Sequence, residues 1–376
     1  MLNAKKYLLL LLIVFIPLVL SGCGSQNKLL ILNWGEYINE DAVALFEDMY
    51  DVQVTVSIAD SNELFYSKLK SGTTAYDLIL PSDYMIEKMY LKGLLQEIDY
   101  TKLSNYDPLN NGYLQGLTSI MDSMMPETQN YYVPYFWGTF GLMYNKKVDG
   151  LKEALETYQW DAYFNPSLRP NSTRTGMYDT PQYAFATVML YQNLDPNDTS
   201  EENIELASQI LKDANFSVWA DDQLKKSIAA NNLDLAFVWT GDFLDMLYVD
   251  LGDGIAYEEV NYDIFVPDRT VAFVDAFVIP HNARHVDLAH EFINFFLDPE
   301  IAYMNASVVG YATPLQSSYD MIVNYVGDDQ WLNDWARAYL EYYEDTPDFQ
   351  GNPLQSLDQA VVSQLTLMVN NVKTGG

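Results

Sequence analysis

Residues 28–80, KLLILNWGEYINEDAVALFEDMYDVQVTVSIADSNELFYSKLKSGTTAYDLIL, decide the fold. Short apolar runs open and close this stretch, at 28–33 and 77–80. Between them, residues 52–58 alternate apolar and polar side chains with the period of a strand. The stretch therefore predicts three strands, of which the first is buried.

Helical patterns separate these three strands. Asn39 is suited to cap a helix whose first turn contains Glu40 and Asp41, and a second helix is predicted from about Asn62. A third is predicted over 85–91, after the last strand. Strand–helix–strand alternation at this spacing is typical of a parallel sheet flanked by helices.

The same alternation returns in the second half of the chain. Strands are predicted at 233–239 and 273–279, and helices at 181–191, 201–212, 221–230, 287–297, 331–343 and 359–373. For 376 residues, two α/β lobes are the economical interpretation. In open sheets, ligands bind where the carboxyl ends of strands meet. We therefore look for the site just after the strands.

Composition excludes several classes of function. The chain has 52 Asp and Glu residues against 20 Lys and Arg, a formal net charge of −32. Sequence-independent nucleic-acid binding needs a basic face, which this balance does not supply. There is one cysteine, Cys23, so the chain has no intrachain disulfide framework and no cysteine-rich zinc site.

The N-terminal segment predicts the compartment. Lys5 and Lys6 precede an apolar run over 8–20, which is too short to span a bilayer and is typical of a signal peptide. Leu20-Ser21-Gly22-Cys23 then resembles the bacterial lipobox. We therefore expect residues 1–22 to be removed and Cys23 to carry lipid, including palmitate. Residues 23–27 form the tether, and the body lies outside the cell membrane, on the periplasmic side where an outer membrane exists.

Side chains that suit a polyamine follow the predicted strand ends. A dication needs carboxylates for its ammonium groups and flat apolar walls for its methylenes, and aromatic faces also attract cations. The sequence places aromatic, hydroxyl and acidic residues together at these positions: Trp34, Glu36, Tyr37, Ser82, Asp83, Tyr84, Trp239, Asp242, Phe273 and Asp275.

Each of these residues also has a structural interpretation. The aromatic residues fit a core or a rim, and Glu36 and Asp242 are placed to cap the helices that follow them. Asp275 is harder to explain structurally because it lies inside the apolar run 271–279. A carboxylate buried there needs a partner, either a cationic ligand or a structural hydrogen bond. We favour the cationic ligand.

Six short motifs carry a resemblance that spans nearly the whole mature chain: NWGEY at 33–37, YDLILPS at 76–82, VPYFWG at 133–138, VWTGD at 238–242, VDAFVIP at 274–280 and VGYATP at 309–314. In this order they resemble the spermidine/putrescine-binding proteins of bacterial polyamine ABC transporters. The resemblance implies a two-lobed clamp like that of periplasmic binding proteins, each lobe a mainly parallel sheet flanked by helices, with a polyamine ligand, a permease and an ATPase as partners and no cofactor.

The resemblance also implies a division of the chain. The first lobe would comprise 28–136 plus 274–305, and the second 137–273 plus 306–376. Crossing segments near 134–138 and 273–280 would serve as hinges when the lobes close on the ligand. We expect a monomer.

Residue roles carried over from the resemblance are as follows. The aromatic walls would be formed by Trp34, Tyr37, Trp239 and Phe273, and the hydroxyl contacts by Ser82 and Tyr84. Asp275 would be the central ammonium anchor. Tyr311 and Gln355 would close the site. Asp242 and Glu36 stand where the putrescine-preferring branch has acids.

One motif departs from the spermidine-preferring branch. Two positions that carry acids there hold Thr180 and Tyr183 here. The adjacent Asp179 either replaces these acids or only caps the helix that begins at Pro181. The choice between putrescine, spermidine and another amine therefore stays open.

Other chemistries have little support. His281, His285 and His290 lie in one stretch without an HExxH motif, so we expect neither a metal site nor an enzyme built on a Ser-His-Asp triad. The remaining alternative is a binding lipoprotein for another small ligand, such as a sugar or a different cationic amine. A sugar would need fewer convergent negative charges.

Overall fold

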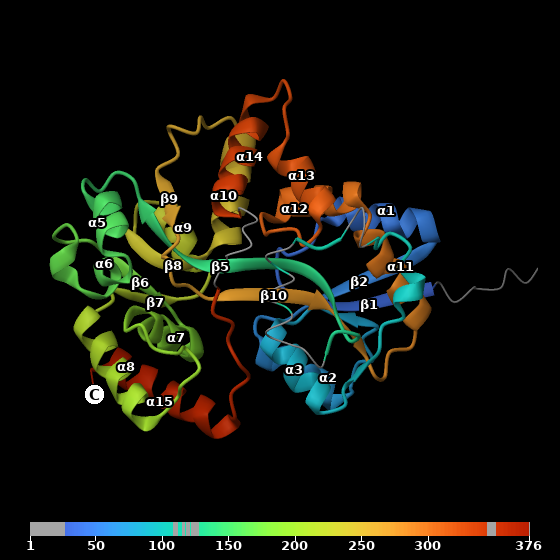
Figure 1. Ribbon diagram of the computed structural model, residues 1–376, viewed down its shortest axis with the longest axis horizontal. Coiled ribbons are helices and arrows are strands. Elements are labelled where there is room, and N and C mark those ends of the chain that lie inside the picture. The colour runs from blue at the N-terminus through green and yellow to red at the C-terminus, as the bar shows by residue number, and fades with distance from the viewer. Residues whose placement is uncertain are drawn as a thin grey trace, which may run out of the picture.

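The computed structural model describes residues 27–107, 112–114, 117, 121, 128–343 and 351–375. The predicted signal peptide and the lipid-modified Cys23 lie outside the described residues. Two groups of strands and helices lie side by side in Figure 1, and two long strands connect them across the middle of the molecule. This arrangement confirms the predicted two-lobed α/β fold.

The first lobe is built on a parallel three-stranded sheet. Strand β1 (Asn27–Asn33) lies between β2 (Val52–Ile58) and β3 (Leu78–Ile79). The strands run parallel because a helix returns the chain after each of the first two. Asn39 caps the first of these helices, as predicted, by accepting from the backbone N of Asp41 at 2.8 Å. The helices are α1 (Glu40–Tyr50), α2 (Asn62–Ser71) and α3 (Asp83–Leu91).

Two strands cross between the lobes. β5 (Val133–Asn145) is buried along its whole length and pairs antiparallel with β10 (Ala272–Phe277) through its first half. Its second half pairs antiparallel with β8 (Leu235–Trp239) and β9 (Tyr262–Phe265) in the second lobe. The two predicted hinge segments are therefore neighbouring strands, and Figure 1 shows both running across the centre.

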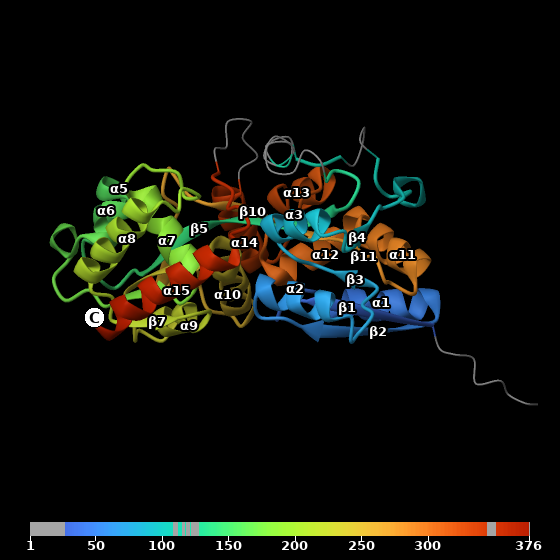
Figure 2. The same ribbon diagram turned by 90° about the horizontal axis from the view of Figure 1, so that it is seen from below.

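The second lobe has a mixed sheet, in the order β10-β5-β8-β6-β7. The strands β8, β6 (Thr175–Tyr178) and β7 (Val218–Ala220) are parallel, as predicted, but β5 is antiparallel to its partners. Figure 2 shows the C-terminal helix α15 lying across α7 and α8. The helices of this lobe are α5 (Leu151–Tyr158), α6 (Trp160–Phe164), α7 (Pro181–Tyr191), α8 (Glu201–Ala214), α9 (Gln223–Ala229), α10 (Thr240–Gly252), α14 (Gln330–Tyr342) and α15 (Gln359–Thr374).

Shorter elements complete the two lobes: β4 (Leu95–Gln96) paired with β11 (Ile279–Pro280), the 3₁₀ turns η1 (Tyr100–Lys102) and η2 (Pro166–Leu168), and helices α11 (Val286–Phe296), α12 (Pro299–Val309) and α13 (Gln316–Val323). Val274 pairs with Trp137, so two of the proposed lobe boundaries lie opposite each other in one ladder. The third, between 305 and 306, falls inside the continuous helix α12. The lobe boundaries stay a proposal.

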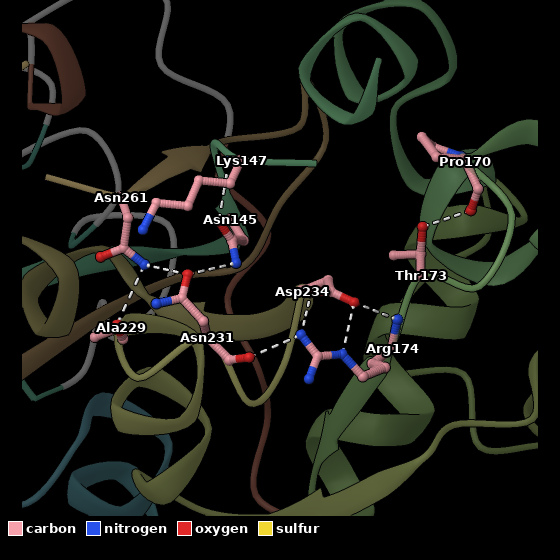
Figure 3. A network of polar contacts seen from close by, with 9 residues as sticks. All are labelled: Asn145, Lys147, Pro170, Thr173, Arg174, Ala229, Asn231, Asp234 and Asn261. Carbon is pink, nitrogen blue, oxygen red and sulfur yellow. Dashed lines mark hydrogen bonds and ion pairs between the residues drawn. The ribbon is translucent and has the colours of Figure 1, made fainter. Parts of the chain in front are cut away.

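A polar network fixes the starts of the second-lobe strands (Figure 3). The Arg174 side chain makes two hydrogen bonds to the Asp234 carboxylate, at 2.9 and 2.6 Å, and a third to the backbone oxygen of Asn231, and the Arg174 backbone N also donates to Asp234 at 2.8 Å. The Asn231 side chain in turn accepts from Asn145 and Asn261. This network holds the end of β8 that lies away from Trp239. None of the described helices combines the length and apolar character needed to cross a bilayer.

Candidate functional site

The candidate site begins with Asp275, in the middle of the crossing strand β10. The residue is only 5% exposed, and its Oδ2 accepts a hydrogen bond from the Tyr37 hydroxyl at 2.8 Å. The other carboxylate oxygen, Oδ1, has no partner with ordinary hydrogen-bond geometry among the described residues. Asp275 also has no cationic partner among the residues that the structure describes. The predicted structural alternative therefore accounts for only one of its two oxygens.

The surroundings of Asp275 make its charge costly. Burial raises the pKa of the carboxyl group to about 7, and hydrogen bonding by the Ser82 and Tyr37 side chains lowers the pKa only in part. A buried carboxylate in this state gains strongly from a cation placed beside it.

A second buried carboxylate lies in the first turn of α10. Asp242 has a side chain 10% exposed, and its Oδ1 accepts from Lys225 Nζ at 2.9 Å and from the Tyr311 hydroxyl at 3.2 Å. Its Oδ2 has no hydrogen-bond partner among the described residues. The interpretation of Asp242 as a helix cap is wrong, because the N-cap position of α10 is Trp239.

Aromatic rings connect the two carboxylates. Tyr311 packs edge to face against Tyr37, with ring centroids 5.0 Å apart, and against Phe273 at 6.0 Å. Phe273 contacts Trp239 at 4.7 Å, and Trp239 contacts Tyr183 at 5.2 Å. We call these five residues the ring cluster. Their edge-to-face contacts are the arrangement that aromatic pairs prefer, and aromatic rings can pack against alkyl chains and attract cations.

The start of α3 supplies hydroxyl groups to the same region. Asn62 donates to Ser82 Oγ at 3.0 Å and to the Tyr84 hydroxyl at 2.9 Å. The Tyr84 hydroxyl also hydrogen-bonds with Tyr183, which lowers the pKa of Tyr183 against the larger effect of burial. Because Tyr84 belongs to the first lobe and Tyr183 to the second, this pair joins the lobes beside the ring cluster.

Asp83 has a different environment from Asp275. Its Oδ1 accepts from the backbone N of Tyr84, and its Oδ2 accepts from the backbone N of Val274 at 3.0 Å. Burial raises its pKa to about 8, against these hydrogen bonds. One oxygen is thus used within the first turn of α3, and the other holds α3 against β10. The prediction that Asp83 contacts ligand stays a prediction, without support from these contacts.

Four residues that we predicted to contact the ligand make their described contacts with residues outside the ring cluster. Trp34 packs against Phe65 and donates to the backbone oxygen of Leu80 at 2.8 Å. The exposed Asp179 pairs with Lys373 at 2.6 Å. The backbone of the exposed Gln355 bonds to Asn197 and Gln182.

Glu36 is the fourth of these residues. It is exposed, with φ of 52°, and it does not cap α1, since Asn39 does. The capping interpretation of Glu36 is therefore wrong. Its charge raises the pKa of Asp245 on α10, so it faces the second lobe from the first. Ligand contacts by these four residues stay predictions.

Sequence patterns did not identify three residues that shape the site. Asn62 fixes the hydroxyl pair at the start of α3, Lys225 binds Asp242, and Asp245 lies one turn after Asp242 on α10. A lysine 17 residues before its partner has no local pattern. No group of three or more potential metal-ligating side chains occurs in the described residues.

Comparison with known proteins places the chain in a family. The family model for bacterial extracellular solute-binding proteins matches residues 41–338. The chain belongs to this family. A relative among the family's proteins is the putrescine-binding periplasmic protein PotF of Escherichia coli (strain K12), 30% identical over 313 residues, which cover 78% of this chain and 81% of the relative.

Two further solute-binding proteins are similar. The putrescine/cadaverine-binding protein of Pseudomonas aeruginosa is 28% identical over 77% of this chain and 80% of its own length. The structure of the spermidine/putrescine ABC transporter substrate-binding protein PotD from Streptococcus pneumoniae superposes with a TM-score of 0.70, at 25% identity over 93% of this chain and 99% of that one.

Family membership settles several predictions. The chain is an extracytoplasmic solute-binding protein of an ABC transport system, which confirms the predicted family and function class. It also confirms that the chain is a binding protein and not an enzyme, because the family's members bind solutes for transport.

Proposed function

We propose that this solute-binding protein captures a polyamine, of which putrescine is the simplest example, and presents it to the permease. The observation that carries the proposal is the pair of buried carboxylates, Asp275 and Asp242, each with an oxygen that accepts no hydrogen bond of ordinary geometry from a described residue. Each of them offers an acceptor to one end of a diammonium ligand. The relatives named for putrescine binding support the same ligand class.

The ligand would lie along the ring cluster. One ammonium group would bind Asp275 with Tyr37, and the other would bind Asp242 with Tyr311. The methylenes would pack on Trp239 and Phe273, whose rings bury alkyl surface and also stabilise the nearby cations. Ser82, Tyr84 and Tyr183 would supply hydroxyl contacts beside the chain.

Capture would proceed by closure of the two lobes. Tyr37 and Tyr84 belong to the first lobe, and Trp239 and Asp242 to the second, so a ligand between them stabilises the closed arrangement. The closed protein would then dock on the permease and its ATPase. We further propose that it acts as a monomer and that lipid on Cys23 tethers it to the membrane, which keeps it close to the transporter.

Calorimetry tests the proposal. Putrescine, cadaverine, spermidine and an oligosaccharide panel are titrated into protein freed of bound amines by unfolding and refolding. We expect saturable heat with at least one amine and none with the sugars. Heat with a sugar alone would overturn the proposed ligand class.

A further inference from the structure

A protonated lysine lies inside the proposed ligand site. The Lys225 side chain, on α9, is only 6% exposed, and its Nζ lies 2.9 Å from Asp242 Oδ1. Burial alone would lower the pKa of Lys225, but the carboxylate of Asp242 outweighs this effect and raises the pKa to about 12. The charge of Lys225 is therefore present at every pH at which the protein works, in a place where a ligand ammonium is also expected.

Asp245 belongs to the same group of charges. It is half-buried one turn after Asp242, so the two acids share a face of α10. The pKa of Asp245 is raised to about 6, chiefly by burial; within this shift the charge of Lys225 lowers the pKa and that of Asp242 raises it, so Asp245 is mostly ionised at neutral pH. We call Lys225, Asp242 and Asp245 the charge triad.

The triad carries one net negative charge, from two carboxylates and one ammonium. The charge of Asp222 raises the pKa of Asp242, and the charge of Glu36 raises the pKa of Asp245. Both of these outer acids are exposed, so water and salt screen their charges. Lys226, the next residue, is exposed as well. At the other end of the ring cluster, Asp275 has no cationic partner in the described chain. At each end of the site, the buried or half-buried acids of the described chain therefore outnumber the buried cations by one.

We propose that Lys225 sets the amine selectivity of the site, by neutralising one of two adjacent carboxylates so that the triad accepts a single ammonium group. This inference rests on the proposed function. A diamine matches the two ends one to one. A triamine would bring a further ammonium into a buried region with no carboxylate left for it, and an unpaired buried cation is costly. Lys225 is thus a residue that excludes the longer polyamine.

Removal of Lys225 would change this balance. The triad would then hold two carboxylates without a cation, and a ligand that delivers two ammonium groups there would gain more than one that delivers a single group. Specificity is a difference between affinities, so the informative quantity is the ratio of the putrescine and spermidine dissociation constants.

Calorimetry on Lys225→Met tests the inference. Methionine matches the lysine side chain up to its last carbon and lacks the charged amino group. We expect the affinity for spermidine relative to putrescine to rise about tenfold or more, the size of one charge-assisted hydrogen bond. The matched control is Lys226→Met, which removes an exposed lysine from the same helix and is expected to leave the ratio unchanged. The double variant Lys225→Met with Asp245→Asn restores one net negative charge, and we expect it to return the ratio toward the wild-type value.

The outcomes separate this inference from the proposed function. Wild-type protein that binds no amine would contradict the proposed function itself. Wild-type protein that binds amines, with a ratio that Lys225→Met leaves unchanged or moves toward putrescine, would overturn the role of Lys225. If Lys225→Met does not fold, Asp245→Asn alone gives the answer. It should weaken putrescine more than the monoamine butylamine, and equal losses for both would overturn the inference.

Discussion

Replacement of Asp275 by Asn should affect stability and binding in opposite directions. The pKa of Asp275 is raised from 3.8 to about 7 in the folded protein, chiefly by burial. The folded state therefore holds the proton more tightly than the unfolded chain does. The stability linked to this proton is present below about pH 4 and is lost as the pH rises through about 7.

The size of this loss follows from the shift. A change of about three pKa units corresponds to about 4 kcal/mol of unfolding free energy at pH 8, because each unit contributes about 1.4 kcal/mol. Asn carries no charge and avoids this loss, although its amide must find its own hydrogen bonds. We therefore expect ligand-free Asp275→Asn to be more stable than wild type by roughly 2 kcal/mol at pH 8 and by much less at pH 4.

Binding should change in the other direction. Without the carboxylate, a ligand ammonium would be left unpaired in a buried site, which costs about 2–5 kcal/mol, or at least about thirtyfold in affinity. Urea unfolding followed by tryptophan fluorescence measures the first effect, and calorimetry with putrescine measures the second. Both use protein freed of bound amine, since a ligand stabilises the folded state in proportion to its affinity.

Asp83→Asn is the matched control. Asp83 is also buried, but both of its oxygens accept hydrogen bonds from backbone N–H groups. An Asn at this position would place its side-chain NH₂ group against one of these backbone donors. We expect this variant to be less stable than wild type and to lose less than about tenfold in affinity. The reasoning is refuted if Asp275→Asn keeps its affinity within about threefold of wild type, or if it destabilises the free protein as Asp83→Asn does.

Further outcomes follow from the same contacts. Putrescine affinity should rise between pH 5 and 8, by up to about tenfold per unit below pH 7, because the ammonium replaces a proton on Asp275, and calorimetry of Asp275→Asn should show a much flatter profile. Trp239→Ala should weaken putrescine by about tenfold, and unchanged affinity in the same titration would remove Trp239 from the ligand wall. Gly241→Ala should lower both thermal stability and affinity, since its Cβ would lie 2.2 Å from the ring of Tyr311; a variant equal to wild type in both would contradict this packing. Cys23→Ser should abolish labelling with palmitate and release the protein from the membrane fraction, whereas continued labelling would exclude Cys23 as the lipid site.

Local patterns were sufficient to predict most elements of the fold. The alternation over 52–58 and the helix over 181–191 appear in the structure as β2 and α7 with the predicted bounds. Strand β5 was harder to assign because it is buried on both faces along 13 residues and therefore has no alternation. Its antiparallel pairing in the second lobe depends on where the chain enters that lobe, which no short pattern records.

The residues of the candidate site also fall into those that local sequence patterns reveal and those that they do not. Asp275 was recognisable because a carboxylate in an apolar run violates a local rule, and such violations mark functional positions. Lys225 had no such signal, because a single lysine on a helix is ordinary until the fold brings it against Asp242. Asp83 shows the converse: its position after a strand resembles that of a ligand residue, but its backbone partner Val274 is 191 residues away in the chain.

The position of Asp275 relative to the lobes explains why binding and closure should be coupled. The register of β10 against β5 shifts between Asp275 and Ala276, so the anchor lies at an irregularity in the pair of strands that crosses between the lobes. Irregular pairing of this kind bends and twists a strand and re-aims its side chains. An ammonium group held at Asp275 is therefore bound near the expected pivot, where closure moves it little, while Asp242 on the second lobe travels with α10. A ligand that reaches both acids stabilises only the arrangement in which they are one ligand length apart. We therefore expect a monoamine, which reaches only Asp275, to bind without closing the lobes.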